Sequence, residues 1–178
     1  MIAITGKMRS GKDAVAGYLV ENYGFTRYAF GDELKRYAHE LFGPSPAKPR
    51  ELYQWFGQTM RERDPDIWVR KCFEKIEEDR RRAVVRPVIT DLRQPNEYER
   101  CRAEGFVIIR VNCRDEIRLE RMKEAGDLFT EADLEHETET HVDTFAVDFE
   151  ISNNGLILHT YEQIDVIMRE LGIDPIIR

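Results

Sequence analysis

The chain has 178 residues, 42% hydrophobic and 34% charged, a composition typical of one globular domain. Its net charge of −7 argues against a general nucleic-acid or membrane-surface binder. Three widely spaced cysteines exclude a disulfide scaffold and indicate a reducing, cytoplasmic location, and the N-terminal sequence shows no secretory signal. The acidic excess is local, because 13 of the 34 acidic residues lie between residues 115 and 150. That stretch is typical of a solvated helical face, and the mildly basic remainder can host a small anion.

Short apolar segments alternate with helical patterns from the N-terminus onward. Residues Ile2–Thr5 are apolar and end at a glycine, which predicts a buried strand. Lys12–Asn22 has helical spacing, with Gly24 just beyond it as a stop signal. Phe25–Phe30 is aromatic and strand-like, and Gly31-Asp32 then supply a turn and an N-cap for the next helix. This order is the beginning of an α/β fold.

The region from residue 32 to residue 79 is predicted to be helical. Pro65 suits the first turn of the last helix of this block. Trp68, close to that break, is therefore the better candidate for stacking on a base, whereas Trp55 is expected to pack in the core. The expectation for Trp55 rests on an apolar stripe at helical spacing, formed by Leu52, Trp55, Phe56 and Met60.

The second half of the chain repeats the alternation of strands and helices. The expected strands are Val84–Thr90, Phe106–Val111 and Phe149–Ser152, and the expected helices are Glu97–Glu104, Asp115–Glu124 and Tyr161–Leu171. Together these elements predict a three-layer α/β fold with a mainly parallel five-stranded sheet, into which the helical block is inserted.

One motif carries most of the functional information. Residues 6–13, GKMRSGKD, fit the pattern G-x-x-x-x-G-K directly after a strand and directly before a helix. The glycines let successive backbone N–H groups turn inward, and Lys12 adds a charge for the β- and γ-phosphates. A phosphate loop is therefore predicted from Gly6, Lys7, Met8, Arg9, Ser10, Gly11, Lys12 and Asp13.

Two acidic residues are candidates for holding Mg²⁺ with the nucleotide. Asp13 stands where this motif usually has a Ser or Thr ligand, and a carboxylate can face a hard cation directly or through water. Asp91 ends an apolar strand, like the acid in the second half of such sites. It is followed by Leu92-Arg93 rather than by a glutamate that polarises water, which favours transfer to an anionic acceptor over hydrolysis. If Asp13 disables the metal site, the protein is a non-catalytic nucleotide-binding module.

These residues resemble the P-loop nucleoside monophosphate kinase superfamily. The resemblance is greatest to the phage-type deoxynucleoside monophosphate kinases, with dephospho-CoA kinase and animal phosphomevalonate kinase as more distant members. It covers nearly the whole chain in order, and the first and fourth of its segments are the most specific. The segments are residues 6–13, 30–35, 52–68, 91–97 and 151–155.

The resemblance implies a single kinase domain over residues 1–178. Its ATP-binding core comprises residues 1–31, 80–113 and 145–178, its acceptor-binding helical region residues 32–79, and its lid residues 114–140. ATP is the implied donor, Mg²⁺ the cofactor and a nucleoside or deoxynucleoside monophosphate the acceptor. The expected partners include neither nucleic acid nor membrane, and the oligomeric state stays open, with a dimer as one candidate.

The resemblance also assigns roles to individual residues. Lys12 and Arg121 are expected to stabilise the transferring group, and Arg114 or Arg118 to complete the clamp, because the usual second arginine is Ala125 here. Asn153 and Gly155 are expected near the adenine of the donor. The expected acceptor-binding residues are Asp32, Lys35, Gln58, Arg61, Trp68, Asp91 and Arg93.

The chemistry of the acceptor decides whether a general base is needed. A phosphate monoester is already an anion at neutral pH, so a nucleotide acceptor needs no base. A hydroxyl acceptor such as dephospho-CoA requires a carboxylate to take its proton. Asp32 is a candidate catalytic base, or else a helix N-cap. A nucleoside monophosphate kinase is therefore the expected function, with a kinase of another small acceptor and a non-catalytic module as alternatives.

Overall fold

The computed structural model describes residues 1–43, 49–126 and 141–176. The chain divides into two compact units, which we name the core unit (residues 1–27 and 86–178) and the helical unit (residues 28–85). The helical insertion expected over residues 32–79 falls within the second of these units.

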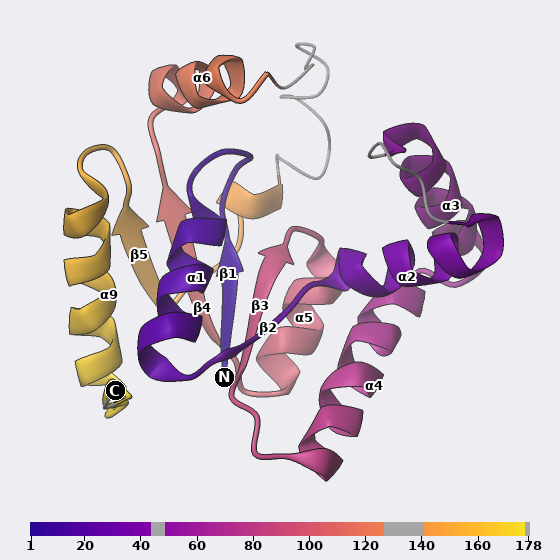
Figure 1. The fold of residues 1–178 in the computed structure, drawn as a ribbon, viewed down its shortest axis with the longest axis horizontal. Coiled ribbons are helices and arrows are strands. Elements are labelled where there is room, and N and C mark those ends of the chain that lie inside the picture. The colour runs from indigo at the N-terminus through magenta and orange to yellow at the C-terminus, as the bar shows by residue number, and fades with distance from the viewer. Residues whose placement is uncertain (44–48, 127–140, 177–178) are drawn as a thin grey trace. The chain divides into compact units, whose positions relative to one another are not determined.

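A five-stranded parallel sheet forms the centre of the core unit (Figure 1). The strand order is β2-β3-β1-β4-β5, so β1 lies between β3 and β4, with Ala3 opposite both Ile89 and Ile108. Helices flank the sheet, which confirms the predicted three-layer α/β fold. The strands are β1 (Ile2–Thr5), β2 (Thr26–Tyr28), β3 (Pro87–Leu92), β4 (Val107–Asn112) and β5 (Phe149–Ser152).

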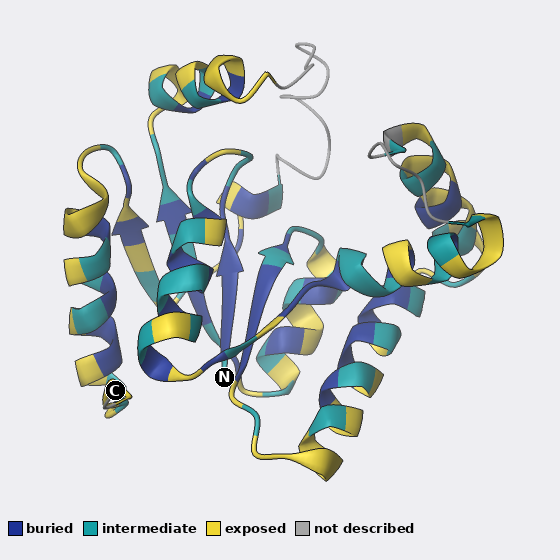
Figure 2. Ribbon diagram, in the orientation of Figure 1, coloured by how far each residue is buried: buried dark blue, intermediate teal, exposed yellow. Residues whose placement is uncertain are grey.

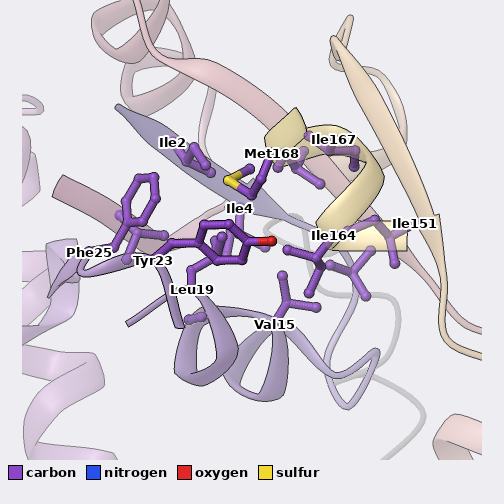
Figure 3. Packing of buried hydrophobic residues seen from close by; sticks show 14 residues of the cluster. Ile2, Ile4, Val15, Leu19, Tyr23, Phe25, Ile151, Ile164, Ile167 and Met168 are labelled. Atoms are coloured by element: carbon purple, nitrogen blue, oxygen red, sulfur yellow. The ribbon is translucent and has the colours of Figure 1, made fainter. Parts of the chain in front are cut away.

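Four helices belong to the core unit. They are α1 (Lys12–Tyr23), α5 (Pro95–Ala103), α6 (Asp115–Glu124) and α9 (Ile157–Glu170), together with a short 3₁₀ turn, η1 (His141–Asp143). Of these, α1 and α9 bury apolar faces. Side chains of α1 and α9 meet those of β1 and β5 in one hydrophobic cluster, which includes Leu19, Ile4 and Ile164 (Figure 3). Each fully buried aliphatic side chain of this kind contributes about 1.5–3 kcal/mol. No helix in the described part of the chain is long and apolar enough to cross a membrane.

Three helices make up the helical unit: α2 (Phe30–Phe42), α3 (Arg50–Arg63) and α4 (Ile67–Arg82). They share a small core of Leu34, Ala38, Phe56 and Trp68. The indole N–H of Trp68 donates to the carbonyl oxygen of Gly57 at 3.2 Å. A Cβ atom at Gly57 would come within 2.5 Å of Leu34 Cδ1, so α2 and α3 approach closely at this glycine.

The structure corrects two predictions for the helical unit. The strand expected over Phe25–Phe30 ends at Tyr28, and α2 begins at Phe30 with Ala29 as its N-cap, so the expected N-cap at Asp32 is wrong. The burial of the two tryptophans is the reverse of the prediction. Trp55 is 56% exposed and Trp68 only 3% (Figure 2 colours the chain by burial). Neighbouring helical residues point about 100° apart, so the face that buries Phe56 turns Trp55 outward.

Candidate functional site

The phosphate loop leaves the carboxyl end of β1 and runs into α1. Gly6 and Gly11 have φ values of +137° and +103°, which L side chains rarely adopt. A Cβ atom would lie 2.5 Å from the Val111 carbonyl oxygen at Gly6 and 2.0 Å from Asn153 Nδ2 at Gly11. Both glycines are therefore required by the backbone conformation and by the close approach of neighbouring strands and loops.

The ammonium group of Lys12 lies against the loop that precedes it. Its Nζ donates to the carbonyl oxygens of Gly6 at 2.6 Å and Lys7 at 2.8 Å. The Ser10 N–H closes the same turn by donating to the Lys7 carbonyl at 3.1 Å. These bonds hold the charge of Lys12 at the loop, which is what binding of β- and γ-phosphates requires.

Asn153 supports the phosphate loop from the end of β5. Its Nδ2 donates to the Ser10 carbonyl at 2.8 Å, and its Oδ1 accepts from Thr160 Oγ1 at 3.0 Å. The residue is 3% exposed, so its side chain is engaged in supporting the loop, and the expected place near adenine stays a prediction. Gly155, the other residue expected there, is exposed.

Two arginines of α6 also bind the loop backbone. Arg118 is buried; its Nε donates to the Met8 carbonyl at 2.8 Å, and its Nη1 pairs with Asp115. Arg121 donates to the carbonyl oxygens of Arg9 at 3.4 Å and Asn153 at 3.2 Å. Two of the three arginines expected in a lid, Arg118 and Arg121, therefore contact the loop. Residues 127–140 of that expected lid lie outside the described residues.

A cavity of about 250 Å³ opens beside the loop at the carboxyl ends of β1 and β4. Ligands of open parallel sheets bind at this edge. The hydroxyl of Ser10 is buried and, among the described residues, has no hydrogen-bond partner. A buried polar group without a partner is costly, so an anionic oxygen in this cavity would be stabilising. The lining residues are Gly6, Lys7, Ser10, Val111, Asn112, Cys113, Arg114, Asp143 and Asn154.

Several lining residues were not predicted from the sequence. Asn154 accepts from the backbone N–H of Arg114 at 2.7 Å, joining the ends of β4 and β5. Cys113 is half-buried, and burial raises the pKa of its thiol while the arginines around it oppose the shift. Because parallel strands bring their carboxyl ends to one edge of the sheet, the position of these residues directly after β4 could have predicted that they line the cavity.

The two predicted magnesium ligands both lie in the core unit. Asp13 is exposed in the first turn of α1, and Asp91 is half-buried in β3. No cluster of three acidic, histidine or cysteine side chains suited to a metal occurs within the described ranges. Mg²⁺ usually binds through one or two carboxylates together with water and substrate phosphates. The donor chemistry of two carboxylates suits such a cation, and the assignment of Asp13 and Asp91 as its ligands stays a prediction.

The predicted acceptor residues are divided between the two units. In α2, Lys35 Nζ lies 3.5 Å from Asp32 Oδ1, an exposed pair one turn apart. In α3, Gln58 is exposed and Arg61 half-buried. Trp68 is a core residue, so the expectation that it stacks on a base is corrected by its burial.

Asp91 and Arg93 belong to the core unit, at the end of β3. Beyond them, the carboxylate of Glu97 accepts from the backbone N–H groups of Arg93 at 2.8 Å and Gln94 at 2.9 Å. Glu97, the last residue of the motif over residues 91–97, therefore has a structural role in the capping box at the start of α5.

Comparison with known proteins gives the family and the fold. The sequence profile of the AAA domain family matches residues 2–140. The chain belongs to this AAA domain family. No curated protein matches the chain.

Solved structures of two kinases and of one further protein share its fold. The shikimate kinase from Bacteroides thetaiotaomicron aligns with a TM-score of 0.62 at 14% identity, covering 97% of this chain and 98% of that one. The dephospho-CoA kinase from Campylobacter jejuni gives 0.54 at 15% identity, with 96% of each chain covered. A Thermus thermophilus protein, TT1252, gives 0.60 at 22% identity and 96% coverage of both chains. At these identities the likeness defines the fold, which is that of P-loop kinases.

Proposed function

We propose that the protein is an ATP-dependent phosphotransferase that converts a nucleoside or deoxynucleoside monophosphate to the diphosphate. The observation that carries the proposal is the phosphate loop, with Lys12 held at its carbonyls, the buried hydroxyl of Ser10 without a partner among the described residues, and a cavity beside the loop that Ser10 helps to line. Such a loop supplies backbone N–H groups and a fixed cation for the phosphates of ATP.

The arrangement suits transfer of a phosphoryl group between two anions. Their mutual repulsion is the main barrier, and it is lowered by positioning and by fixed positive charge. Lys12, Arg118 and Arg121 provide that charge around the loop. Mg²⁺, held by Asp13 and Asp91 in this proposal, would neutralise charge on the phosphates.

The choice of a nucleotide as acceptor rests on the sequence resemblance. Lys35, Arg61 and Arg93 are the proposed ligands of the acceptor phosphate, because planar guanidinium groups bind phosphate in a bidentate manner. The AAA domain family match supports nucleotide binding in general, and the kinases of similar fold support a small-molecule acceptor.

A specific observation also favours a kinase that acts on a hydroxyl group. Because Ala29 rather than Asp32 caps α2, the Asp32 carboxylate is not used as an N-cap. It lies in the first turn of the helix, where a carboxylate could accept a proton from a hydroxyl acceptor. Activity that depends on Asp32 as a base would therefore favour this second candidate.

The decisive experiment measures ADP formation from Mg·ATP with a panel of acceptors. The panel contains ribo- and deoxyribonucleoside monophosphates, dephospho-CoA and phosphomevalonate. We expect turnover with one or a few nucleotides, loss of turnover in Lys12→Ala, and normal turnover in Lys71→Ala, which changes a lysine of α4 that has no predicted role in the site. Turnover with a hydroxyl acceptor alone, lost in Asp32→Asn, would replace the nucleotide acceptor by the second candidate. ATP binding without turnover on any acceptor would indicate a non-catalytic module.

A further inference from the structure

An acidic side chain faces the phosphate loop across the cavity. Asp143 Oδ2 lies 2.9 Å from Nζ of Lys7, and both residues line the cavity next to Ser10. Their side chains are 56% and 34% exposed. An ion pair this exposed contributes little to stability, so it does not explain why a carboxylate stands at a site built for anions.

The backbone around Asp143 is held in place by hydrogen bonds from Arg110. The guanidinium group of Arg110 donates to the carbonyl oxygens of Val142 at 3.2 Å, of Asp143 at 3.4 Å and of Phe145, and it pairs with Glu150 at 2.6 Å.

The next residues of this segment are attached to α5. The ring of Phe145 stacks on Tyr98, with centroids 4.7 Å apart and planes 6° from parallel. Tyr98 and Arg102 both donate to the Ala146 carbonyl, at 2.9 Å and 2.6 Å. The segment that carries Asp143 is thus anchored to β4 and α5. The backbone that carries the Asp143 carboxylate is therefore held at the cavity by contacts other than the one with Lys7.

A carboxylate held at this place affects different forms of a nucleotide differently. The phosphate chain of metal-free ATP meets it as a like charge, and like charges facing each other in a binding site are strongly unfavourable. A bound Mg²⁺ lowers the negative charge of the phosphates and presents a hard cation, for which carboxylate oxygens are preferred ligands. The positive groups at the cavity, Lys7 and Arg114, attract both forms.

We infer that Asp143 is a specificity residue of the phosphate site, selecting the magnesium-bound form of the nucleotide over the metal-free form. The inference rests on the proposed function, since it assumes that the cavity receives the phosphates of a nucleotide. It assigns a role to a residue that lies far in sequence from the phosphate loop and from both predicted magnesium ligands.

The test measures dissociation constants by calorimetry for ATP with excess Mg²⁺ and for ATP with a chelator. We expect Asp143→Asn to tighten binding of metal-free ATP about tenfold, equivalent to about 1.4 kcal/mol, and to change binding of Mg·ATP much less. The preference of the protein for the magnesium-bound form therefore falls. Glu170→Gln, which removes the same charge at the far end of α9, is the control and should leave the preference unchanged.

An unchanged preference in Asp143→Asn, with the unsubstituted protein binding ATP normally, would overturn the inference alone. Equal weakening of both forms would do the same, because it indicates a structural role. Failure of the unsubstituted protein to bind ATP in either form would overturn the proposed function and the inference with it. Circular dichroism checks folding, and Asp143→Ser, for which the same fall is expected, replaces the asparagine variant if that variant does not fold.

Discussion

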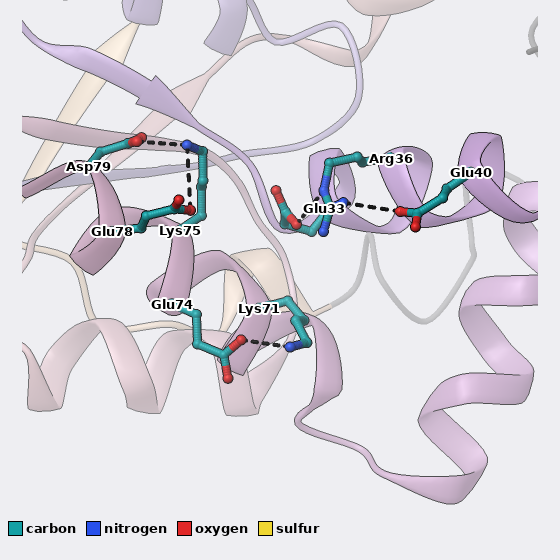
Figure 4. Close-up of polar contacts among 8 residues, drawn as sticks. All are labelled: Glu33, Arg36, Glu40, Lys71, Glu74, Lys75, Glu78 and Asp79. Atoms are coloured by element: carbon teal, nitrogen blue, oxygen red, sulfur yellow. Dashed lines mark hydrogen bonds and ion pairs between the residues drawn. The ribbon is translucent and has the colours of Figure 1, made fainter. Parts of the chain in front are cut away.

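The core unit surrounds its sheet with helices, whereas the three helices of the helical unit share a smaller cluster and carry local ion pairs. One hydrophobic cluster of the core unit contains 14 buried residues, and the cluster that α2, α3 and α4 share contains four. The helices α2 and α4 carry charged pairs one turn apart (Figure 4), such as Arg36 with Glu33 at 2.9 Å and Lys75 with Asp79 at 2.6 Å. Pairs of this kind contribute about 0.3–0.5 kcal/mol each.

The same contrast extends to the functional residues. In the core unit, the backbone of the phosphate loop is fixed by buried donors from Asn153 and Arg118. In the helical unit, the candidate acceptor residues Lys35 and Asp32 form an exposed pair. Under the proposed function, binding of phosphates would thus depend on preorganised backbone geometry, and choice of acceptor on exposed side chains that can change without altering the fold.

Replacement of Trp68 tests whether the two units unfold separately. It is the change with the largest expected effect on stability. Trp68→Ala empties the centre of the small cluster and leaves the Gly57 carbonyl without its indole donor, at a cost of about 3–5 kcal/mol. Hydrogen exchange should accelerate in α2, α3 and α4 and stay slow in β1 and α1. Trp55→Ala, at the exposed tryptophan, is the control. Equal acceleration in both units would show that they unfold together.

Replacement of Asn153 tests the preorganisation of the phosphate loop. Asn153→Ala leaves the Ser10 carbonyl and the Thr160 hydroxyl without their partner, a cost of about 1–3 kcal/mol for a buried polar group. We expect weaker ATP binding by calorimetry and a modest fall in melting temperature. Thr160→Val removes only the bond to Asn153 Oδ1 and should have a smaller effect on ATP binding. Unchanged ATP affinity in Asn153→Ala would show that the loop keeps its shape without this support.

Replacement of Tyr18, at the interface of α1 and α9, has the smallest expected effect on stability at neutral pH. Its effect on the pH dependence of stability is clear in alkaline solution. Burial and a hydrogen bond to Asp165 raise the pKa of Tyr18 from 10.0 to about 12. The folded state therefore holds this proton more tightly than the unfolded state. The resulting stability is fully present below pH 10 and is lost as the pH rises toward 12. Melting temperatures should fall less steeply over this interval in Tyr18→Phe. An identical fall in both proteins would exclude the contribution.

Much of the fold follows from periodic patterns that the sequence displays directly. The strand at Ile2–Thr5 and the helix at Asp115–Glu124 are confirmed at their predicted bounds, because local spacing alone defines them. The phosphate loop is equally visible, since its two glycines stand at positions where the conformation demands them. The local sequence pattern is therefore sufficient to predict an element whose structure does not depend on contacts with distant segments.

The remaining features depend on contacts between distant segments. The burial of Trp68 depends on a close approach at Gly57, which no pattern around residue 68 reveals. Asn153 supports a loop more than 140 residues earlier in the chain. Asp143 belongs to an acidic stretch that looks like a solvated surface, and its place at the cavity depends on carbonyl contacts made by Arg110.

The position of Cys113 gives the protein a single natural attachment point for a reporter group. The other two cysteines, Cys72 and Cys101, are buried, whereas Cys113 lies half-exposed among the residues that line the cavity. Burial raises the pKa of its thiol, so a maleimide dye would attach slowly but at one place. A fluorophore there would lie beside the phosphate loop and report ligand arrival in real time, without an engineered cysteine.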